Sequence, residues 1–209
     1  MDIEDIRNVY GTRTPGVIGE HRFYSVLVPF VANWGNGRYG TSILYEVRAE
    51  GVRQPGEICF PGGHMEEGES PEECAVRETC EEVGIKKDDI QVIGRGDTLY
   101  GANFTLYTFI GSLDAEGIDD FSPDPEEVSE IFAVPVETLI GIDPEHYGER
   151  MAPVIEQGFP YEKVGIDENY PWRTAEYDIP VYDIDGRVIW GLTGRITENV
   201  VEQLRRRQK

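Results

Sequence analysis

The sequence predicts a single domain of the layered α/β or α+β class, and three observations support this. Segments with strand character outnumber those with helix character, but two or three helices are also clear. No internal repeat is visible. The 209 residues are 39% hydrophobic and 28% charged, as in an ordinary globular domain. We therefore expect one domain spanning residues 1–209.

The first predicted element is a hairpin. Residues 23–31 (FYSVLVPFV) and 41–49 (TSILYEVRA) are rich in β-branched and aromatic residues, and both are predicted to be strands. Between them, residues 33–40 (NWGNGRYG) carry Asn-Gly and other glycine turn signals. Residues 56–63 (GEICFPGG) then predict a short strand that runs into a glycine loop.

A helix after this loop has well-defined ends. Ser70 is a suitable N-cap, Pro71 takes the first helical position, and Glu73 completes a capping box. Gly84 is suited to end the helix in the left-handed conformation. We therefore expect a helix over residues 71–83.

The rest of the chain continues the alternation of strands and helices. The segments expected to be strands are 89–100, 103–113, the first part of 130–140, and 187–193. In the rest of 130–140 we expect a proline-led turn or helix. A terminal helix is expected over residues 193–207. Residues 1–20 form an N-terminal extension, and residues 141–180 are rich in Gly, Pro and Tyr with little periodicity. A segment of that length suggests an insertion or lid.

Charge and cysteine content restrict the class of partner. The formal net charge of -21 disfavours nucleic acid and anionic membranes. Cys59, Cys74 and Cys80 form no C-x-x-C pair, and the acidic N-terminus has no apolar signal core. We therefore expect reduced thiols, a cytoplasmic location and no membrane span. The sequence is compatible with a homodimer but does not specify one.

Three glutamates on the predicted helix are the main functional signal. At helical spacing Glu78, Glu81 and Glu82 would share one face, with Val76, Thr79, Cys80 and Val83 on the opposite arc. Acidic residues at this spacing often form only a solvated face. However, between residues 66 and 82 the one basic residue is Arg77, and a carboxylate cluster with so few basic partners suits a hard divalent cation such as Mg²⁺.

Residues 63–85 (GHMEEGESPEECAVRETCEEVGI) resemble the Nudix box, which is Gly, five residues, Glu, seven residues, then Arg-Glu-apolar-x-Glu-Glu-x-Gly-apolar. The matching residues are Gly63, Glu69, Arg77, Glu78, Glu81, Glu82, Gly84 and Ile85. Thr79 departs from the pattern, but a buried hydroxyl can bond to a carbonyl one turn back. Fixed spacing over so many positions is far more specific than a lone glycine fingerprint.

The flanking segments are similar to the coenzyme A diphosphatase branch of this family. These segments are 43–49 (ILYEVRA), 53–63 (RQPGEICFPGG), 124–140 (DPEEVSEIFAVPVETLI) and 188–196 (VIWGLTGRI). The resemblance implies an α/β/α sandwich with a mixed sheet. It also implies hydrolysis of coenzyme A or acyl-CoA to 3′,5′-ADP and 4′-phosphopantetheine or its acylated form, with Mg²⁺ or Mn²⁺ as cofactor.

The resemblance also implies catalytic roles. Glu78 and Glu82 are the first expected metal ligands, and Glu81 is a third ligand or the base that acts on the attacking water. Arg77 is expected to point elsewhere on the helix and to hold Glu69, which would shape the loop. Glu127 is a candidate base or extra ligand, although four acidic residues in its loop also fit a solvated surface.

Substrate contacts are assigned to residues before the helix. Gly62 and Gly63 permit close backbone approach, and Arg48 and Arg53 are candidates to bind a 3′-phosphate. Aromatic residues could contact the substrate, but packing in the core is our default interpretation for each of them; these are Tyr161, Tyr170, Trp172, Tyr177 and Trp190.

Two alternative functions are kept. One is a Nudix hydrolase of another nucleoside diphosphate compound, such as ADP-ribose or NADH. The other is a non-catalytic nucleotide-binding module, against which the intact set of glutamates argues.

Overall fold

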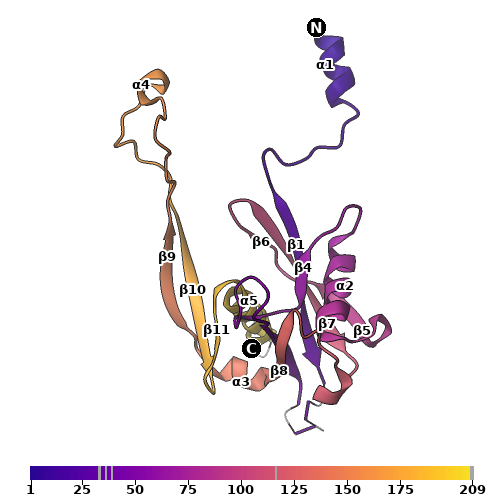
Figure 1. The fold of residues 1–209 in the computed structure, drawn as a ribbon. Helices are drawn as coiled ribbons and strands as arrows, with labels where there is room; N and C mark the ends of the chain where they lie inside the picture. Colours follow the sequence, from indigo (N-terminus) through magenta and orange to yellow (C-terminus); the bar gives the residue numbers. More distant parts are fainter. Residues whose placement is uncertain (33, 36, 39, 116, 208–209) are drawn as a thin grey trace.

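The computed structural model describes residues 1–32, 34–35, 37–38, 40–115 and 117–207. Figure 1 shows a sheet-based body from which a long two-stranded ribbon projects. In the described residues the helices are α1 Ile3–Tyr10, α2 Pro71–Val83, α3 Val136–Gly141, α4 Tyr161–Val164 and α5 Gly191–Arg207. The strands are β1 Arg22–Val31, β2 Ser42–Arg48, β3 Ile58–Cys59, β4 Gly62–His64, β5 Ile90–Arg95, β6 Leu99–Tyr100, β7 Phe104–Leu113, β8 Val128–Pro135, β9 Glu145–Met151, β10 Ala175–Ile184 and β11 Arg187–Ile189.

The main sheet is mixed. Its central order is β3-β2-β1-β7-β5, and β4, β6 and β8 pair with β1, β7 and β2 respectively. The pair β1–β7 is parallel along its whole length, whereas the other pairs are antiparallel. The expected hairpin is present, since β1 and β2 pair antiparallel beside the turn. Residues 33, 36 and 39 of that turn lie outside the described residues.

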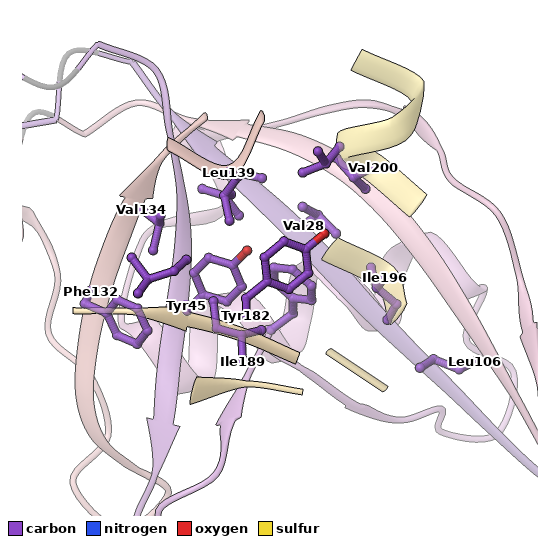
Figure 2. Close-up of a cluster of buried hydrophobic side chains, with 14 residues drawn as sticks. Val28, Tyr45, Leu106, Phe132, Val134, Leu139, Tyr182, Ile189, Ile196 and Val200 are labelled. Atoms are coloured by element: carbon purple, nitrogen blue, oxygen red, sulfur yellow. The ribbon is translucent and has the colours of Figure 1, made fainter. Parts of the chain in front are cut away.

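Helices pack against both faces of this sheet. Successive residues of a strand point to opposite faces, so neighbouring residues of β2 contribute to two different cores. On β2, Ile43 and Tyr45 belong to a core that includes residues of α5, and Figure 2 shows this core with Tyr45 among Phe132, Tyr182 and Ile196. Leu44, on the other face, packs in a second core with Ala75 of α2. The predicted α/β/α arrangement with a mixed sheet is therefore confirmed.

The 141–180 segment is more regular than its sequence suggests. Strands β9 and β10 pair antiparallel, with Glu145 opposite Val181 at one end and Met151 opposite Ala175 at the other. They form the projecting ribbon, with α4 at its tip (Figure 1). All residues of β9 are exposed, so the strand lacks the alternation that would have predicted it.

The core interpretation of the aromatic residues is wrong. Near α4, Tyr161 and Trp172 contact Phe159, and Tyr170 contacts Trp172, so these rings form a small cluster outside both cores. The other two aromatic residues are also outside the cores: Tyr177 lies under the Arg195 guanidinium on the ribbon, and Trp190 is 46% exposed. The terminal helix is present but begins two residues early, at Gly191.

Candidate active site

Helix α2 is fixed at both ends as its sequence predicts. The Ser70 hydroxyl accepts a hydrogen bond from the Glu73 amide, and the Glu73 carboxylate accepts one from the Ser70 amide. Gly84 ends the helix with φ 68°, and its amide donates to the Cys80 carbonyl at 3.1 Å. The helix therefore presents its glutamates in a defined register.

Arg77 holds the loop before α2 in the manner expected. Its Nε donates to Oε1 of Glu69 at 2.8 Å, and its Nη2 donates to Oε2 of the same carboxylate at 3.0 Å. This two-point contact is the strong form of an arginine–carboxylate pair. The guanidinium lowers the pKa of Glu69 to about 2. Oε2 of Glu69 also accepts the Glu66 amide, so the pair fixes the backbone of the loop.

The expectation that Arg77 points away from the other glutamates is wrong. Its Nη1 donates to Oε1 of Glu78 at 2.9 Å and to Oε2 of Glu81 at 3.0 Å. One guanidinium therefore contacts three carboxylates. These contacts raise the pKa of Arg77, chiefly through Glu69, so the arginine remains charged.

The three glutamates do not share one solvent-facing surface. Glu82 is only 5% exposed and faces the sheet, whereas the Glu81 side chain is 59% exposed and the Glu78 side chain 15%. Thr79 is buried, and its hydroxyl donates to the Ala75 carbonyl at 2.7 Å, as expected for this departure from the Nudix pattern. The described structure thus separates Glu81, turned to Arg77, from the buried Glu82.

Gly62 and Gly63, expected to lie in a loop, instead begin strand β4 and pair with β1. This glycine segment is packed closely against the helix. The Gly62 amide donates to Oε2 of Glu82 at 2.6 Å. Gly62 has φ 153°, and a Cβ there would lie 2.6 Å from Cα of Val26 on β1. A Cβ on Gly63 would lie 2.5 Å from Cδ of Glu78. Gly62 therefore requires glycine both for space and for its backbone conformation, whereas a Cβ on Gly63 would fit if the end of the Glu78 side chain moved.

Sequence reasoning missed a further carboxylate, Glu46 on β2. It is 1% exposed, and its Oε1 accepts a hydrogen bond from the Cys59 thiol at 3.1 Å. Burial raises the pKa of Glu46 to about 7, and nearby carboxylates add to this effect. Burial, followed by the charge of Glu46, raises the pKa of Glu82 to about 9. A charged residue inside an otherwise apolar strand was the available sequence signal.

Glu127 lies on an exposed loop that is joined to the end of α2. The Ser122 amide donates to the Val83 carbonyl, and the Asp124 amide donates to the Glu82 carbonyl. The negative charge of Glu127 helps to raise the pKa of Glu46, Glu78 and Glu82, after burial in each case. The loop therefore brings Glu127 to the same region as these three carboxylates.

The candidate ligands have the chemistry that a hard divalent cation requires. Glu46, Glu78, Glu82 and Glu127 all supply carboxylate oxygens, and the burial of two of them without a cationic hydrogen-bond partner favours a positive ion there. In the described arrangement Glu78 is turned to Arg77 and Glu82 to Gly62, and no group of three potential ligands is drawn together. Holding a cation therefore requires these side chains to rotate.

Of the two candidate phosphate ligands, Arg48 is the last residue of β2 and Arg53 lies in the turn between β2 and β3. Nε of Arg48 donates to the Arg53 carbonyl at 2.7 Å, so the two arginines belong to one structured turn. Arg53 is exposed and Arg48 partly buried. Arg48 is also close enough to Glu46 to lower its pKa. None of the described helices is long and apolar enough to cross a membrane.

Comparison with known proteins gives a family match. The family model described as NUDIX domain matches residues 35–157. The chain is 28% identical to Nudix hydrolase 3 of Caenorhabditis elegans over 66% of this chain and 59% of that protein. It is 33% identical to the peroxisomal coenzyme A diphosphatase NUDT7 of Mus musculus over 56% and 48% respectively.

The match to a third relative covers a larger share of that relative's length than the two matches above. The mitochondrial coenzyme A diphosphatase NUDT8 of Homo sapiens is 27% identical over 86% of this chain and 68% of that protein. The chain thus spans about half to two thirds of the curated relatives that it matches. A solved MutT/nudix family protein from Enterococcus faecalis has a TM-score of 0.50 at 13% identity, covering 99% of this chain and 69% of that one, and this likeness concerns the fold alone.

Proposed function

This chain belongs to the NUDIX domain family, and from that premise we propose that it hydrolyses the diphosphate bond of coenzyme A or acyl-CoA. The products would be 3′,5′-ADP and 4′-phosphopantetheine or its acylated form. The reaction would need a divalent cation, Mg²⁺ or Mn²⁺.

One observation carries the proposal: two carboxylates, Glu82 of α2 and Glu46 of β2, are buried without a basic hydrogen-bond partner among the described residues, and the Gly62 amide donates to Glu82. A highly acidic protein needs a cation between these carboxylates and an anionic substrate. The coenzyme A branch is supported by two relatives that carry the name coenzyme A diphosphatase and by Arg48, at the end of β2, and Arg53, in the following turn.

In the proposed mechanism, Glu78 and Glu82 would hold the cation. When bound, such an ion neutralises phosphate oxygens and makes water a better nucleophile. Gly62 and Gly63 let the backbone approach the diphosphate, and the Arg77–Glu69 pair keeps that loop in place. Arg48 and Arg53 would bind the 3′-phosphate.

Two glutamates compete for the role of general base. Oε2 of Glu81 is paired with Arg77, whereas the exposed Glu127 has no ion pair in the described residues. We therefore assign proton acceptance from the attacking water to the Glu127 carboxylate. Glu81 keeps the role of a third ligand if its contact with Arg77 opens.

A substrate panel tests the proposal. Purified protein is incubated with Mg²⁺ or Mn²⁺ and coenzyme A, dephospho-CoA, acyl-CoA, ADP-ribose, NADH or dinucleoside polyphosphates, and products are identified by mass. We expect 3′,5′-ADP from coenzyme A, a higher kcat/KM for coenzyme A than for dephospho-CoA, and no hydrolysis in excess chelator.

The other outcomes point to the alternatives. Faster cleavage of ADP-ribose or NADH would indicate a different Nudix substrate. Binding of a nucleotide without any cleavage would indicate a non-catalytic module. Two similar relatives are named as peroxisomal and mitochondrial proteins, so the cytoplasmic location stays a prediction for this chain, as does a homodimer. The lid role of residues 141–180 is likewise a proposal.

A further inference from the structure

Glu46 has one buried carboxylate oxygen without a partner. Oε1 accepts the Cys59 thiol, but Oε2 has no hydrogen-bond partner among the described residues, and the side chain is 1% exposed. An unpartnered buried polar atom is costly, and native proteins seldom retain one without a bound water or ion. The atom therefore requires an explanation at this position.

The geometry of β2 directs Glu46 towards α2. Glu46 follows Leu44 by two residues and so shares its face of the sheet. Leu44 packs in the core that contains Ala75 and Val83 of α2. Glu82 is buried on the same helix, next to Val83. Two buried carboxylates thus approach each other from the sheet and from the helix.

Basic side chains do not compensate this pair. Within the described residues, Glu82 receives a hydrogen bond only from the Gly62 amide and Glu46 only from a thiol. Arg48 acts on Glu46 at longer range, but its Nε is bonded to the Arg53 carbonyl. Burying carboxylates without a compensating partner is costly, and a bound cation would offset that cost.

We propose that Glu46 is a ligand of the divalent cation, held together with Glu82, so that the metal site extends from α2 onto the sheet. The proposal rests on the metal-dependent function given above but adds a residue from outside the Nudix box. Oε2 of Glu46 would bind the ion, while Cys59 holds Oε1 and fixes the orientation of the carboxylate.

The test measures metal binding rather than activity. Mn²⁺ is titrated into the wild-type protein, Glu46→Gln and the control Glu50→Gln, and free Mn²⁺ is followed by electron paramagnetic resonance. Glu50 is an exposed carboxylate just beyond the end of β2, so the control removes the same charge without touching the site. We expect Glu46→Gln to raise the Kd for Mn²⁺ at least about tenfold, and Glu50→Gln to leave it unchanged.

A second variant avoids burying the side-chain amide that Glu46→Gln introduces. Glu46→Met replaces the carboxylate with an apolar side chain of similar length, and removing an unpaired buried charge is expected to maintain or raise Tm in chelator. It should weaken Mn²⁺ binding as Glu46→Gln does. Wild-type affinity in either folded variant, or no Mn²⁺ binding by the wild-type protein, would overturn the proposal. Weakened binding with no cleavage of any substrate would leave the ligand assignment intact and reject the proposed function instead.

Discussion

The Gly62 amide donates a 2.6 Å hydrogen bond to Oε2 of Glu82, which ties the glycine loop to the last turn of α2. Charge-assisted bonds from backbone amides are short and strong. This bond is the main polar compensation that Glu82 receives in its buried position. It also means that Glu82 serves both the shape of the loop and the chemistry proposed for the site.

Glu82→Gln separates these two roles. The amide oxygen of glutamine can still accept from Gly62, and the change removes a buried ionisable carboxyl without altering the size of the side chain, so Tm in chelator should equal or exceed that of the wild type. A lost metal ligand should lower kcat by at least about a hundredfold and reduce the thermal shift caused by Mg²⁺. Steady-state kinetics and thermal-shift titrations measure both effects.

The control is Glu72→Gln, which removes an exposed carboxylate from the first turn of the same helix. It should alter neither kcat nor the response to Mg²⁺. Near-native turnover in Glu82→Gln would show that Glu82 is not a ligand.

Arg77→Lys should loosen the loop before α2. Lysine keeps the charge but cannot reproduce the two-point contact with Glu69. We expect faster proteolysis within residues 64–69 and a fall in kcat/KM on the order of 10–100-fold, as for residues that orient metal ligands. Arg150→Lys is the matched control, because Arg150 also makes two contacts with one glutamate, Glu176, but on the exposed ribbon. Equal effects of the two changes would contradict a special role for Arg77.

Local signals explain how much of the site could be predicted. The ends of α2 depend on Ser70, Glu73 and Gly84, which act within a few residues of the sequence, so the helix and its register followed directly. The Arg77–Glu69 contact followed from the spacing of the Nudix box. Both involve partners that the helix itself or the loop just before it brings together.

The residues that were missed depend on distant partners. Glu46 is buried because β3 and β8 flank β2 and because α2 covers that face, and none of these contacts can be read from residues 43–49. The burial of Glu82 has the same cause. Strand β9 was missed for a different reason: it is exposed along its length, and β10 is its one strand partner among the described residues, so it has no apolar alternation.

Acid should weaken the Arg77–Glu69 pair within a defined pH range. The folded pKa of Glu69 is about 2, below about 4.3 for an unfolded glutamate. A lowered folded pKa means that the stabilisation is fully present above about pH 4.3 and is lost as the pH falls through the folded value. Glu69→Gln should therefore be less stable than the wild type near neutral pH, and the difference should shrink towards pH 2. Urea unfolding at several pH values measures it, and a difference independent of pH would reject the ion pair as its cause.

Replacing the two loop glycines should have opposite consequences. In Gly62→Ala the new Cβ meets the backbone of Ser25 and Val26, and φ 153° is unfavourable for alanine, so Tm should fall. In Gly63→Ala the Cβ meets only the end of the Glu78 side chain, which can rotate away, so Tm should change little. Displacing Glu78 should nevertheless weaken Mg²⁺ binding and lower kcat by about a hundredfold, because small misplacements at a reacting centre are costly. Gly94→Ala on β5 is the control, since a Cβ there meets nothing within 4 Å. If Gly63→Ala kept native turnover and metal affinity, Glu78 would have no role that depends on its present position, and the metal site would have to be built from Glu82 and the carboxylates of the sheet and the 122–127 loop.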